Sequence, residues 1–207
     1  MKRPVTYLIT DGNSVDSNFP ESIRRLVDLA RSAVQNGISY IQIREKNLNA
    51  ANLLKLTKTI ADVVQGSSTR LLVNDRADVA LAAGADGVHL TTRSISVADI
   101  RRAFGEQLMV FASIHSEADI LSAAEQGADA VVVGPVFDSP GKGKPTGLDP
   151  LHRACTRFSP FEIIALGGID ESNFELVLDA GASGFAGIRG FDSAEKIASI
   201  ANLLNNR

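Results

Sequence analysis

The most constraining feature of the chain is a sequence pattern that occurs four times. It consists of a helix-like segment, a glycine with a small or acidic neighbour, and a run of apolar residues. The glycines that mark the copies are Gly37, Gly84, Gly127 and Gly181. A glycine just past a helix can adopt the left-handed conformation that closes it, and the apolar run that follows is typical of a buried parallel strand. The copies recur at roughly 43 to 54 residues, about two strand–helix units, which indicates one αβ step repeated along the chain.

Eight apolar runs are predicted to be strands, at residues 5–10, 39–44, 70–74, 87–90, 109–114, 130–136, 161–167 and 184–188. Segments of helical period alternate with them, near 19–36, 50–65, 76–83, 96–104, 117–126, 149–157, 172–180 and 193–205. This alternation, without a linker-like tract, predicts one α/β domain over residues 1–207, a single-domain (β/α)8 TIM barrel. The alternative is an open doubly wound sheet, but the sequence lacks the glycine fingerprint that such folds place after the first strand.

The composition narrows the classes of function. A formal net charge of −3 offers no field for nucleic acid or an anionic membrane. The single cysteine, Cys155, excludes an internal disulfide and a multi-cysteine metal site, and it suits a reducing compartment. The first residues are too short and poorly flanked for a signal peptide, so none is expected there, and no apolar stretch approaches the roughly 18 residues of a membrane helix. We therefore expect a cytoplasmic protein with neither nucleic-acid nor membrane partners.

Polar residues follow several of the predicted strands, where a barrel would bring them together. Gln42, Arg44 and Lys46 alternate along the end of the second strand and therefore share one side of it. Two cations and an amide buried without partners would be costly, so this pattern favours a bound polyanion. The alternative is a solvated strand end in which Arg44 pairs with Glu45.

The ends of the third, fourth and fifth strands also carry candidate residues. Asp75 is a candidate oxygen ligand for Mg²⁺, and Asn74 can donate its amide to a phosphate oxygen. The same pair is typical of a helix cap, and both interpretations stay open. Ser113 can hydrogen-bond a ligand, whereas His89 lies inside its strand and is interpreted as a core histidine whose hydrogen bonds are satisfied.

Two loops indicate phosphate binding. The irregular stretch 137–148 is rich in Gly, Pro and Lys, and its Lys142 can fold onto a phosphate once a ligand has bound; an ordinary solvated loop is the alternative. Gly167 and Gly168 follow the seventh strand and Gly190 follows the eighth, where barrels expose backbone N–H groups to a phosphate. A packing role for these glycines is the alternative.

Over essentially its whole length the chain resembles the thiamine phosphate synthase family, in the wider thiamine phosphate synthase and TenI-like superfamily. The matching segments are Tyr7-Leu8-Ile9-Thr10-Asp11, Gln42-Ile43-Arg44-Glu45-Lys46, Leu72-Val73-Asn74-Asp75-Arg76, Gly84-Ala85-Asp86-Gly87-Val88-His89-Leu90, Gly127-Ala128-Asp129, Gly134-Pro135-Val136-Phe137 and Ala165-Leu166-Gly167-Gly168-Ile169. An ordered set of this kind is far more specific than any single motif, and the fold that it implies is the same barrel.

The resemblance implies a transferase that joins a hydroxymethylpyrimidine diphosphate to a thiazole phosphate and releases diphosphate with the help of Mg²⁺. Its partners would be these small phosphorylated substrates. The residues carried over by position are Arg44, Lys46, Asn74 and Lys142 for the diphosphate, Asp75 for Mg²⁺, Gln42 and Ser113 for the pyrimidine, and Gly168 and Ile188 for the thiazole phosphate. Gly167 and Arg189 are also expected among the substrate-binding residues. Of these, Arg44, Lys46, Lys142 and Ser113 are the residues expected to act in catalysis.

The chain departs from the family pattern at three places. Ser94 stands where the family usually has the second acidic Mg²⁺ ligand, and Arg93 adds a positive charge beside it. In the 137–148 loop Gly141 replaces a hydroxyl-bearing residue, although Lys142 is retained. Arg189 stands where a serine is expected, and it can either grip a phosphate or fill the thiazole pocket.

These departures leave two further interpretations. A TenI-like thiazole tautomerase would share the barrel and the thiazole phosphate site, but the histidine that such proteins place before the Val-Phe pair is Pro135 here. A catalytically silent protein that binds a thiazole phosphate is the other. The sequence leaves the oligomeric state open, although a homo-oligomer paired through helical faces is common among barrels of this kind.

Overall fold

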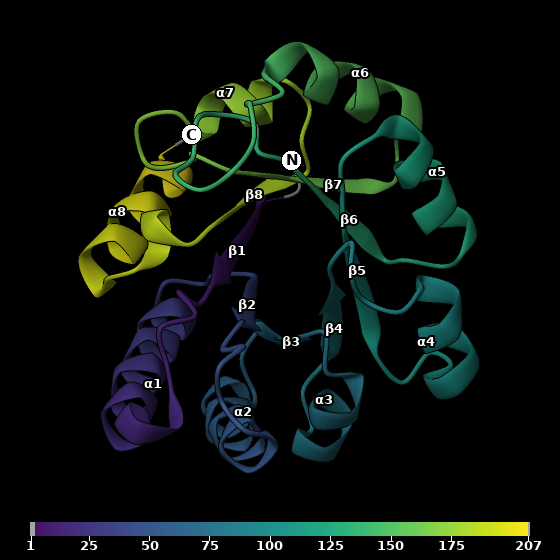
Figure 1. Ribbon diagram of the computed structural model, residues 1–207. Coiled ribbons are helices and arrows are strands. Elements are labelled where there is room, and N and C mark those ends of the chain that lie inside the picture. Colours follow the sequence, from purple (N-terminus) through teal and green to yellow (C-terminus); the bar gives the residue numbers. More distant parts are fainter. Residues whose placement is uncertain (1–2, 207) are drawn as a thin grey trace.

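The computed structural model describes residues 3–206 and shows a closed barrel of eight parallel strands in sequential order, ringed by helices (Figure 1). The strands are β1 (Val5–Ile9), β2 (Tyr40–Ile43), β3 (Arg70–Asn74), β4 (Gly87–Leu90), β5 (Met109–Ile114), β6 (Ala130–Val133), β7 (Glu162–Leu166) and β8 (Gly184–Gly187). The α/β barrel predicted from the sequence is confirmed, and the open sheet is wrong because β8 pairs with β1.

The helices alternate with the strands as the periodicity predicts. They are α1 (Phe19–Gln35), α2 (Ala50–Val64), α3 (Ala77–Ala83), α4 (Val97–Phe104), α5 (Glu117–Glu125), α6 (Leu148–Phe158), α7 (Phe174–Asp179) and α8 (Ala194–Asn205). Two short 3-10 helices, η1 (Asp16–Asn18) and η2 (Arg189–Phe191), were not predicted, because three residues carry no periodic signal. In the part of the chain that the structure describes, no helix is both long and apolar enough to cross a membrane.

The strands have two apolar faces, as parallel strands covered on both sides require. One face of each strand packs against the surrounding helices in a large core. The other face fills the inside of the barrel with a second core, whose members are Val5, Tyr7, Ile9, Leu72, Phe111, Ala130, Val132, Ile164 and Ala186. Because this interior is packed, ligands can be held only at the ends of the barrel, and the carboxyl ends of the strands form its open mouth.

The sixth strand is shorter than predicted. We expected it over 130–136, but β6 ends at Val133, and the chain leaves the sheet at Gly134 and Pro135. Val136 is nevertheless buried, because the loop folds back onto β7: the N–H of Val136 donates to the carbonyl of Leu166 at 2.9 Å. The long loop between β6 and α6 therefore lies over the mouth of the barrel beside β7.

Closure of the barrel between β8 and β1 depends on a glycine. Gly184 is paired with Val5, and a Cβ atom at Gly184 would overlap the carbonyl oxygen of Val5 and lie 2.5 Å from its Cβ. The two backbones approach more closely than any side chain permits.

Gly184→Ala should therefore lower the free energy of unfolding by about 1–3 kcal/mol, the usual cost of overpacking a core. Urea denaturation followed by circular dichroism measures this change. Gly143→Ala is the matched control, since a Cβ at Gly143 would meet nothing within 4 Å. Equal stability of the two variants would show that the contact between β8 and β1 tolerates a side chain at Gly184.

Candidate active site

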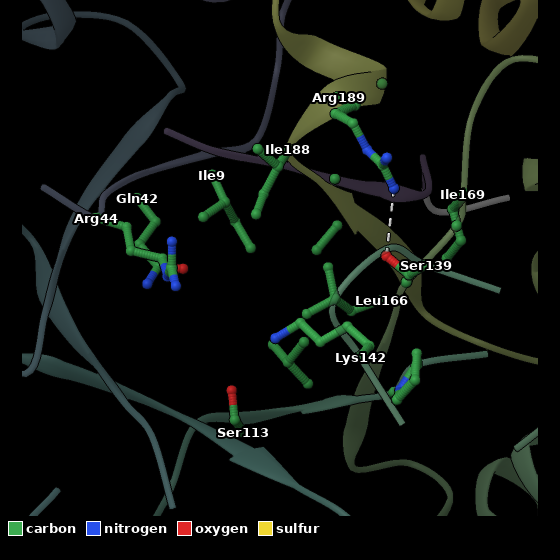
Figure 2. Close-up of a pocket in the computed structure, with 18 of the residues that line it drawn as sticks. Ile9, Gln42, Arg44, Ser113, Ser139, Lys142, Leu166, Ile169, Ile188 and Arg189 are labelled. Carbon is green, nitrogen blue, oxygen red and sulfur yellow. Dashed lines mark hydrogen bonds between the residues drawn. The ribbon is translucent and has the colours of Figure 1, made fainter. Parts of the chain in front are cut away.

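A cavity of about 1170 Å³ opens at the carboxyl ends of the strands. Its floor contains one side chain near the end of each strand: Ile9, Gln42, Asn74, His89, Ser113, Val132, Leu166 and Ala186. Ten of the eleven site residues predicted from the sequence line it: Gln42, Arg44, Lys46, Asn74, Ser113, Lys142, Gly167, Gly168, Ile188 and Arg189. Figure 2 shows several of them, including Lys142 and Arg189, around the same hollow.

Gln42 presents an acceptor atom to this cavity. The side chain is 1% exposed, and its Nε2 donates to Oδ1 of Asn74 at 3.0 Å. Within residues 3–206, the buried Oε1 of Gln42 has no hydrogen-bond partner. Leaving a buried acceptor unsatisfied costs free energy, so a ligand with an N–H or O–H donor is favoured at this point.

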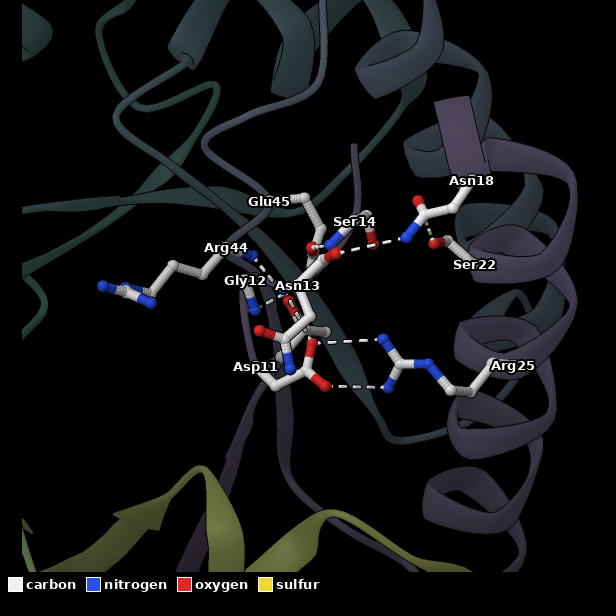
Figure 3. A network of polar contacts seen from close by, with 10 residues as sticks. Asp11, Gly12, Asn13, Ser14, Asn18, Ser22, Arg25, Arg44 and Glu45 are labelled. Carbon is white, nitrogen blue, oxygen red and sulfur yellow. Dashed lines mark hydrogen bonds and ion pairs between the residues drawn. The ribbon is translucent and has the colours of Figure 1, made fainter. Parts of the chain in front are cut away.

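Glu45 does not pair with Arg44, so the interpretation of this segment as an Arg–Glu pair is wrong. The Glu45 carboxylate is buried and accepts hydrogen bonds from the N–H groups of Gly12 (3.2 Å) and Ser14 (2.8 Å) in the loop after β1. Figure 3 shows the Arg44 side chain extending away from this carboxylate. Asp11 in the same loop is paired with Arg25 at 3.0 Å. Glu45 and Arg25 thus stabilise the loop after β1, and the Arg44 side chain lines the cavity without an acidic partner.

Within residues 3–206, four of the cations that line the cavity are not paired with carboxylates, whereas Lys196 is paired with Asp192 at 2.8 Å. In the described part of the chain, no carboxylate forms an ion pair with Arg44, Lys46, Lys142 or Arg189. The only hydrogen bond that the Arg189 guanidinium makes there is a long one, 3.4 Å, to the hydroxyl of Ser139. Unpaired cations that converge on one hollow favour an anionic ligand.

Asp75 is the one predicted site residue that does not line the cavity. It lies immediately behind, where its carboxylate accepts from the Asn74 amide at 2.6 Å, from the Thr91 hydroxyl at 3.3 Å and from the Ser94 hydroxyl. The cap interpretation is wrong, because Arg76 is the N-cap residue of α3 and makes no side-chain cap. Asp75 has a φ of 61°, in the left-handed region that non-glycine residues rarely adopt and that often marks functional sites.

The residues around Asp75 allow a limited test for Mg²⁺. Among residues 3–206 there is no group of three or more His, Cys, Asp or Glu that could hold a metal ion. Asp75 is joined instead by the hydroxyls of Thr91 and Ser94, and Arg93 lies at the same rim. Mg²⁺ is commonly bound by one or two carboxylates together with substrate phosphates. The donor set fits Mg²⁺ only in that mode, with a phosphorylated ligand supplying further oxygens.

His89 is a core histidine with both ring nitrogens in hydrogen bonds, as predicted. Its Nδ1 lies 3.0 Å from the hydroxyl of Tyr7, and its Nε2 lies 2.8 Å from the hydroxyl of Ser113. Burial lowers the pKa of His89 to about 4; the negative charge of Asp75 opposes this shift, and the positive charges of Arg44 and Lys46 add to it. The prediction missed that this neutral imidazole also lines the cavity, because the alternation of β4 alone does not say which side chains reach the mouth.

Other lining residues were also missed. Lys196, at the start of α8, lines the cavity and donates to the carbonyl of Arg189 at 2.8 Å. The sequence could have indicated Lys196 as a lining residue, because the helix predicted after the eighth strand begins near the carboxyl ends of the strands. His115 is exposed at the rim, and its Nδ1 lies 3.1 Å from the carbonyl of Gly134.

The glycines after β7 both pack and face the cavity. At Gly168, with a φ of 66°, a Cβ would lie 2.8 Å from the Cβ of Phe137, so the packing interpretation is correct. The Gly167 carbonyl accepts from the N–H of Phe137 at 3.0 Å. Among the described residues, the N–H of Gly168 donates to no protein acceptor. The β6–α6 loop therefore packs against the two glycines and still leaves the N–H of Gly168 open to the cavity.

These features define a (β/α)8 barrel with a strand-end cavity that is lined by unpaired cations, buried amides and exposed glycine backbone. The family model described as thiamine monophosphate synthase matches residues 6–191. The chain therefore belongs to the thiamine monophosphate synthase family.

Individual relatives agree with this assignment. A thiamine-phosphate synthase of Albidiferax ferrireducens is 35% identical over 91% of this chain and 84% of the relative. One of Gloeobacter violaceus is 38% identical over 91% of the chain but is longer, so that the chain spans 53% of it. The solved structure of thiamine phosphate pyrophosphorylase from Pyrococcus furiosus superposes with a TM-score of 0.85 at 26% identity, covering 99% of this chain and 96% of that one.

The lowered pKa of His89 has a consequence for stability. The unfolded chain binds a proton on this imidazole near pH 6.5, whereas the folded protein does so only near pH 4. Because the unfolded state holds more protons between these values, stability is present above pH 6.5 and is lost as the pH falls. We expect this group to remove about 3 kcal/mol from the free energy of unfolding between pH 7 and a pH below 4.

Urea denaturation over this pH range, compared between the wild type and His89→Gln, isolates that contribution, because all other titrating groups are shared. The stability difference between the two proteins should shrink as the pH falls. Parallel curves would contradict the burial of a neutral His89. His152→Gln, on the outer helix α6, is the control and should follow the wild type.

Proposed function

We propose that this protein is a thiamine-phosphate synthase, which joins a hydroxymethylpyrimidine diphosphate to a thiazole phosphate and releases diphosphate. Family membership supports the reaction class. The observation that carries the proposal is the juxtaposition of unpaired cations with the orphaned acceptor of Gln42 in one cavity. A ligand that combines a polyanion with a hydrogen-bonding ring satisfies both.

The reaction needs charge stabilisation and orientation more than a nucleophile. The bond between the pyrimidine methylene and the diphosphate oxygen breaks, and the electron pair leaves with the diphosphate. The ring-stabilised methylene cation is then captured by the lone pair of the thiazole nitrogen. Electrostatic stabilisation of the departing anion and alignment of the two rings are the terms that a protein can supply.

Four side chains from three parts of the fold would hold the diphosphate. Arg44 and Lys46 follow β2, Asn74 ends β3, and Lys142 lies in the β6–α6 loop. Arg44 supplies a planar fork of donors that suits a phosphate, and the lysines supply point charges. Lys142 lies in an exposed segment of its loop, which suits a group that moves onto the anion after the substrate has bound.

The pyrimidine ring would lie over the floor of the cavity. Gln42 on β2 supplies an acceptor there, and Ser113 on β5 supplies a hydroxyl. These groups come from rigid strands, so they would fix the plane of the ring before the bond to the diphosphate breaks.

The thiazole phosphate would bind at the side of β7 and β8. The backbone of Gly167, Gly168 and Ile188 borders the cavity there, and Arg189 begins η2 at the same rim. We propose that Arg189 grips this phosphate rather than filling the thiazole pocket, because its guanidinium is exposed and has no ion-pair partner in the described residues. Backbone N–H groups and an arginine are a common combination at phosphate sites.

Asp75, with the hydroxyls of Thr91 and Ser94, would hold Mg²⁺ when the diphosphate substrate is present. When bound, the ion would neutralise charge on the departing diphosphate. Asn74 lies between this group and the cavity, since it donates to Asp75 and accepts from Gln42. The chain's own residues thus join the metal position to the pyrimidine position.

The whole chain is proposed to work as one domain, because every strand contributes to the cavity. A cytoplasmic location follows from the proposed biosynthetic reaction and from the single cysteine. The tautomerase alternative is not favoured, since Pro135 has no group that could transfer a proton where that activity would need a histidine.

The direct test supplies purified protein with hydroxymethylpyrimidine diphosphate, thiazole phosphate and Mg²⁺. We expect release of diphosphate and formation of thiamine phosphate in equal amounts, and loss of both on addition of EDTA. Binding of thiazole phosphate without turnover at saturating metal would instead support the silent binder. Interconversion of thiazole carboxylate tautomers would support the TenI-like activity.

The position of the metal is tested by two substitutions. Asp75→Asn removes the only carboxylate of the group and should raise the Mg²⁺ concentration for half-maximal activity by about tenfold or more. Ser94→Asp adds a second carboxylate against Asp75 and should lower that concentration. Asp78→Asn, on the exposed side of α3, is the control. Unchanged Mg²⁺ dependence in both test variants would exclude this site.

A further inference from the structure

A buried tyrosine below the cavity has no role in the proposed reaction. Tyr7 is 0% exposed and lies in the packed interior of the barrel, outside the cavity lining. Its hydroxyl lies 3.0 Å from Nδ1 of His89, and within the described part of the chain it has no other hydrogen-bond partner. The question is which of the two atoms donates.

The phenol must be the donor. Burial raises the pKa of Tyr7 well above its usual value, so the hydroxyl keeps its proton. If Nδ1 of His89 carried the hydrogen, the Tyr7 O–H would be buried without an acceptor, which is costly. Donation from Tyr7 to Nδ1 satisfies both groups at once.

This direction fixes the tautomer of His89. The imidazole is only 3% exposed, and no carboxylate in the described part of the chain forms an ion pair with it, so its surroundings favour the neutral form. With Nδ1 accepting from Tyr7, the one ring hydrogen is on Nε2. Nε2 lies 2.8 Å from the hydroxyl oxygen of Ser113 and therefore donates to it.

Ser113 is thereby left with its own proton to donate. Its oxygen accepts from His89, and among residues 3–206 no protein acceptor takes the Ser113 proton. Figure 2 shows the hydroxyl directed into the cavity. We propose that Tyr7 and His89 are positioning residues, which fix Ser113 as a hydrogen-bond donor toward the bound ligand.

A second chain of hydrogen bonds gives the opposite polarity beside it. The Asp75 carboxylate can only accept, so Asn74 turns its amide N–H₂ to Asp75 at 2.6 Å and its carbonyl to Gln42 at 3.0 Å. Gln42 then has its Nε2 engaged and its Oε1 left as an acceptor. The floor of the cavity thus presents one fixed donor, Ser113, and one fixed acceptor, Gln42.

This pair selects a ring with the complementary edge. A heterocycle with a ring nitrogen that accepts and an amino group that donates satisfies both groups. A ring with a carbonyl in place of the amino group would set two acceptors against each other at Gln42. This specificity rests on the proposed function for the identity of the substrate, an aminopyrimidine diphosphate, but the direction of the hydrogen bonds does not.

The direction is tested on the protein alone. Nuclear magnetic resonance of histidine-labelled protein distinguishes the two neutral tautomers from the ring ¹⁵N shifts, and only His89, His115 and His152 must be assigned. We expect His89 as the Nε2–H tautomer in the wild type and a rise of the Nδ1–H tautomer in Tyr7→Phe. A wild-type His89 with its hydrogen on Nδ1 would overturn the proposal, whether or not the protein is a synthase.

The consequence for the ligand is tested by a double-mutant cycle. Tyr7→Phe should weaken the binding of hydroxymethylpyrimidine diphosphate by about three- to tenfold, the effect of one hydrogen bond, measured by titration calorimetry. In the Ser113→Ala background the same change should have no effect, because Tyr7 acts through Ser113. A general packing defect would weaken binding equally in both backgrounds and would overturn the positioning role.

Tyr40→Phe is the matched control. The Tyr40 ring packs edge-on against Tyr7, with centroids 5.8 Å apart, and the described hydrogen bonds include none from its hydroxyl to His89. It should leave both the tautomer of His89 and the affinity unchanged. If the wild type shows the Nε2–H tautomer but no turnover and no binding of the diphosphate, the proposed function fails while the hydrogen-bond direction stands.

Discussion

Closure of the sheet between β8 and β1 is the constraint on which the rest of the structure depends. Gly184 permits the two backbones to meet, and the remaining strands then follow in sequential order around one axis. Because all strands are parallel, closure brings their carboxyl ends to one mouth. Arg44 and Arg189 are far apart in the sequence yet border the same cavity. Without closure, the cations would lie along an open edge, where water and salt would screen them.

The sequence predicted the fold well because its signals are local. Most helix–strand junctions carry a glycine followed by an apolar run, and eight strands that alternate with helices leave few topologies. The error at the sixth strand shows the limit of this argument. Val136 is as buried as a strand residue, but it is buried in a loop that folds back onto β7. Hydrophobicity reports burial, and it does not report whether the backbone bonds to a neighbouring strand.

The site was predicted less completely than the fold. Barrel geometry identified which residues gather at the mouth, because strand ends are local features, but it did not identify their partners. Glu45 is bound by the β1 loop rather than by Arg44, and Asp75 has a left-handed backbone, and neither follows from spacing. Tyr7 and His89 are 82 residues apart in the sequence. A contact of that range is fixed only when the two strands are packed inside the closed barrel.

The cations at the rim of the cavity and the buried polar groups of its floor contribute to ligand recognition in different ways. The exposed cations at the rim can adjust to a flexible polyanion, and their attraction depends little on direction. The amides, the imidazole and the hydroxyls beneath them are buried, and each of their hydrogen bonds restricts the direction of the next. Asp75 can only accept hydrogen bonds, and Tyr7 can only donate to His89. Through one intervening side chain, each therefore determines whether the next group presents a donor or an acceptor to the ligand. The packed interior of the barrel thus does more than support the site, because it sets the polarity of the floor on which a ring must lie.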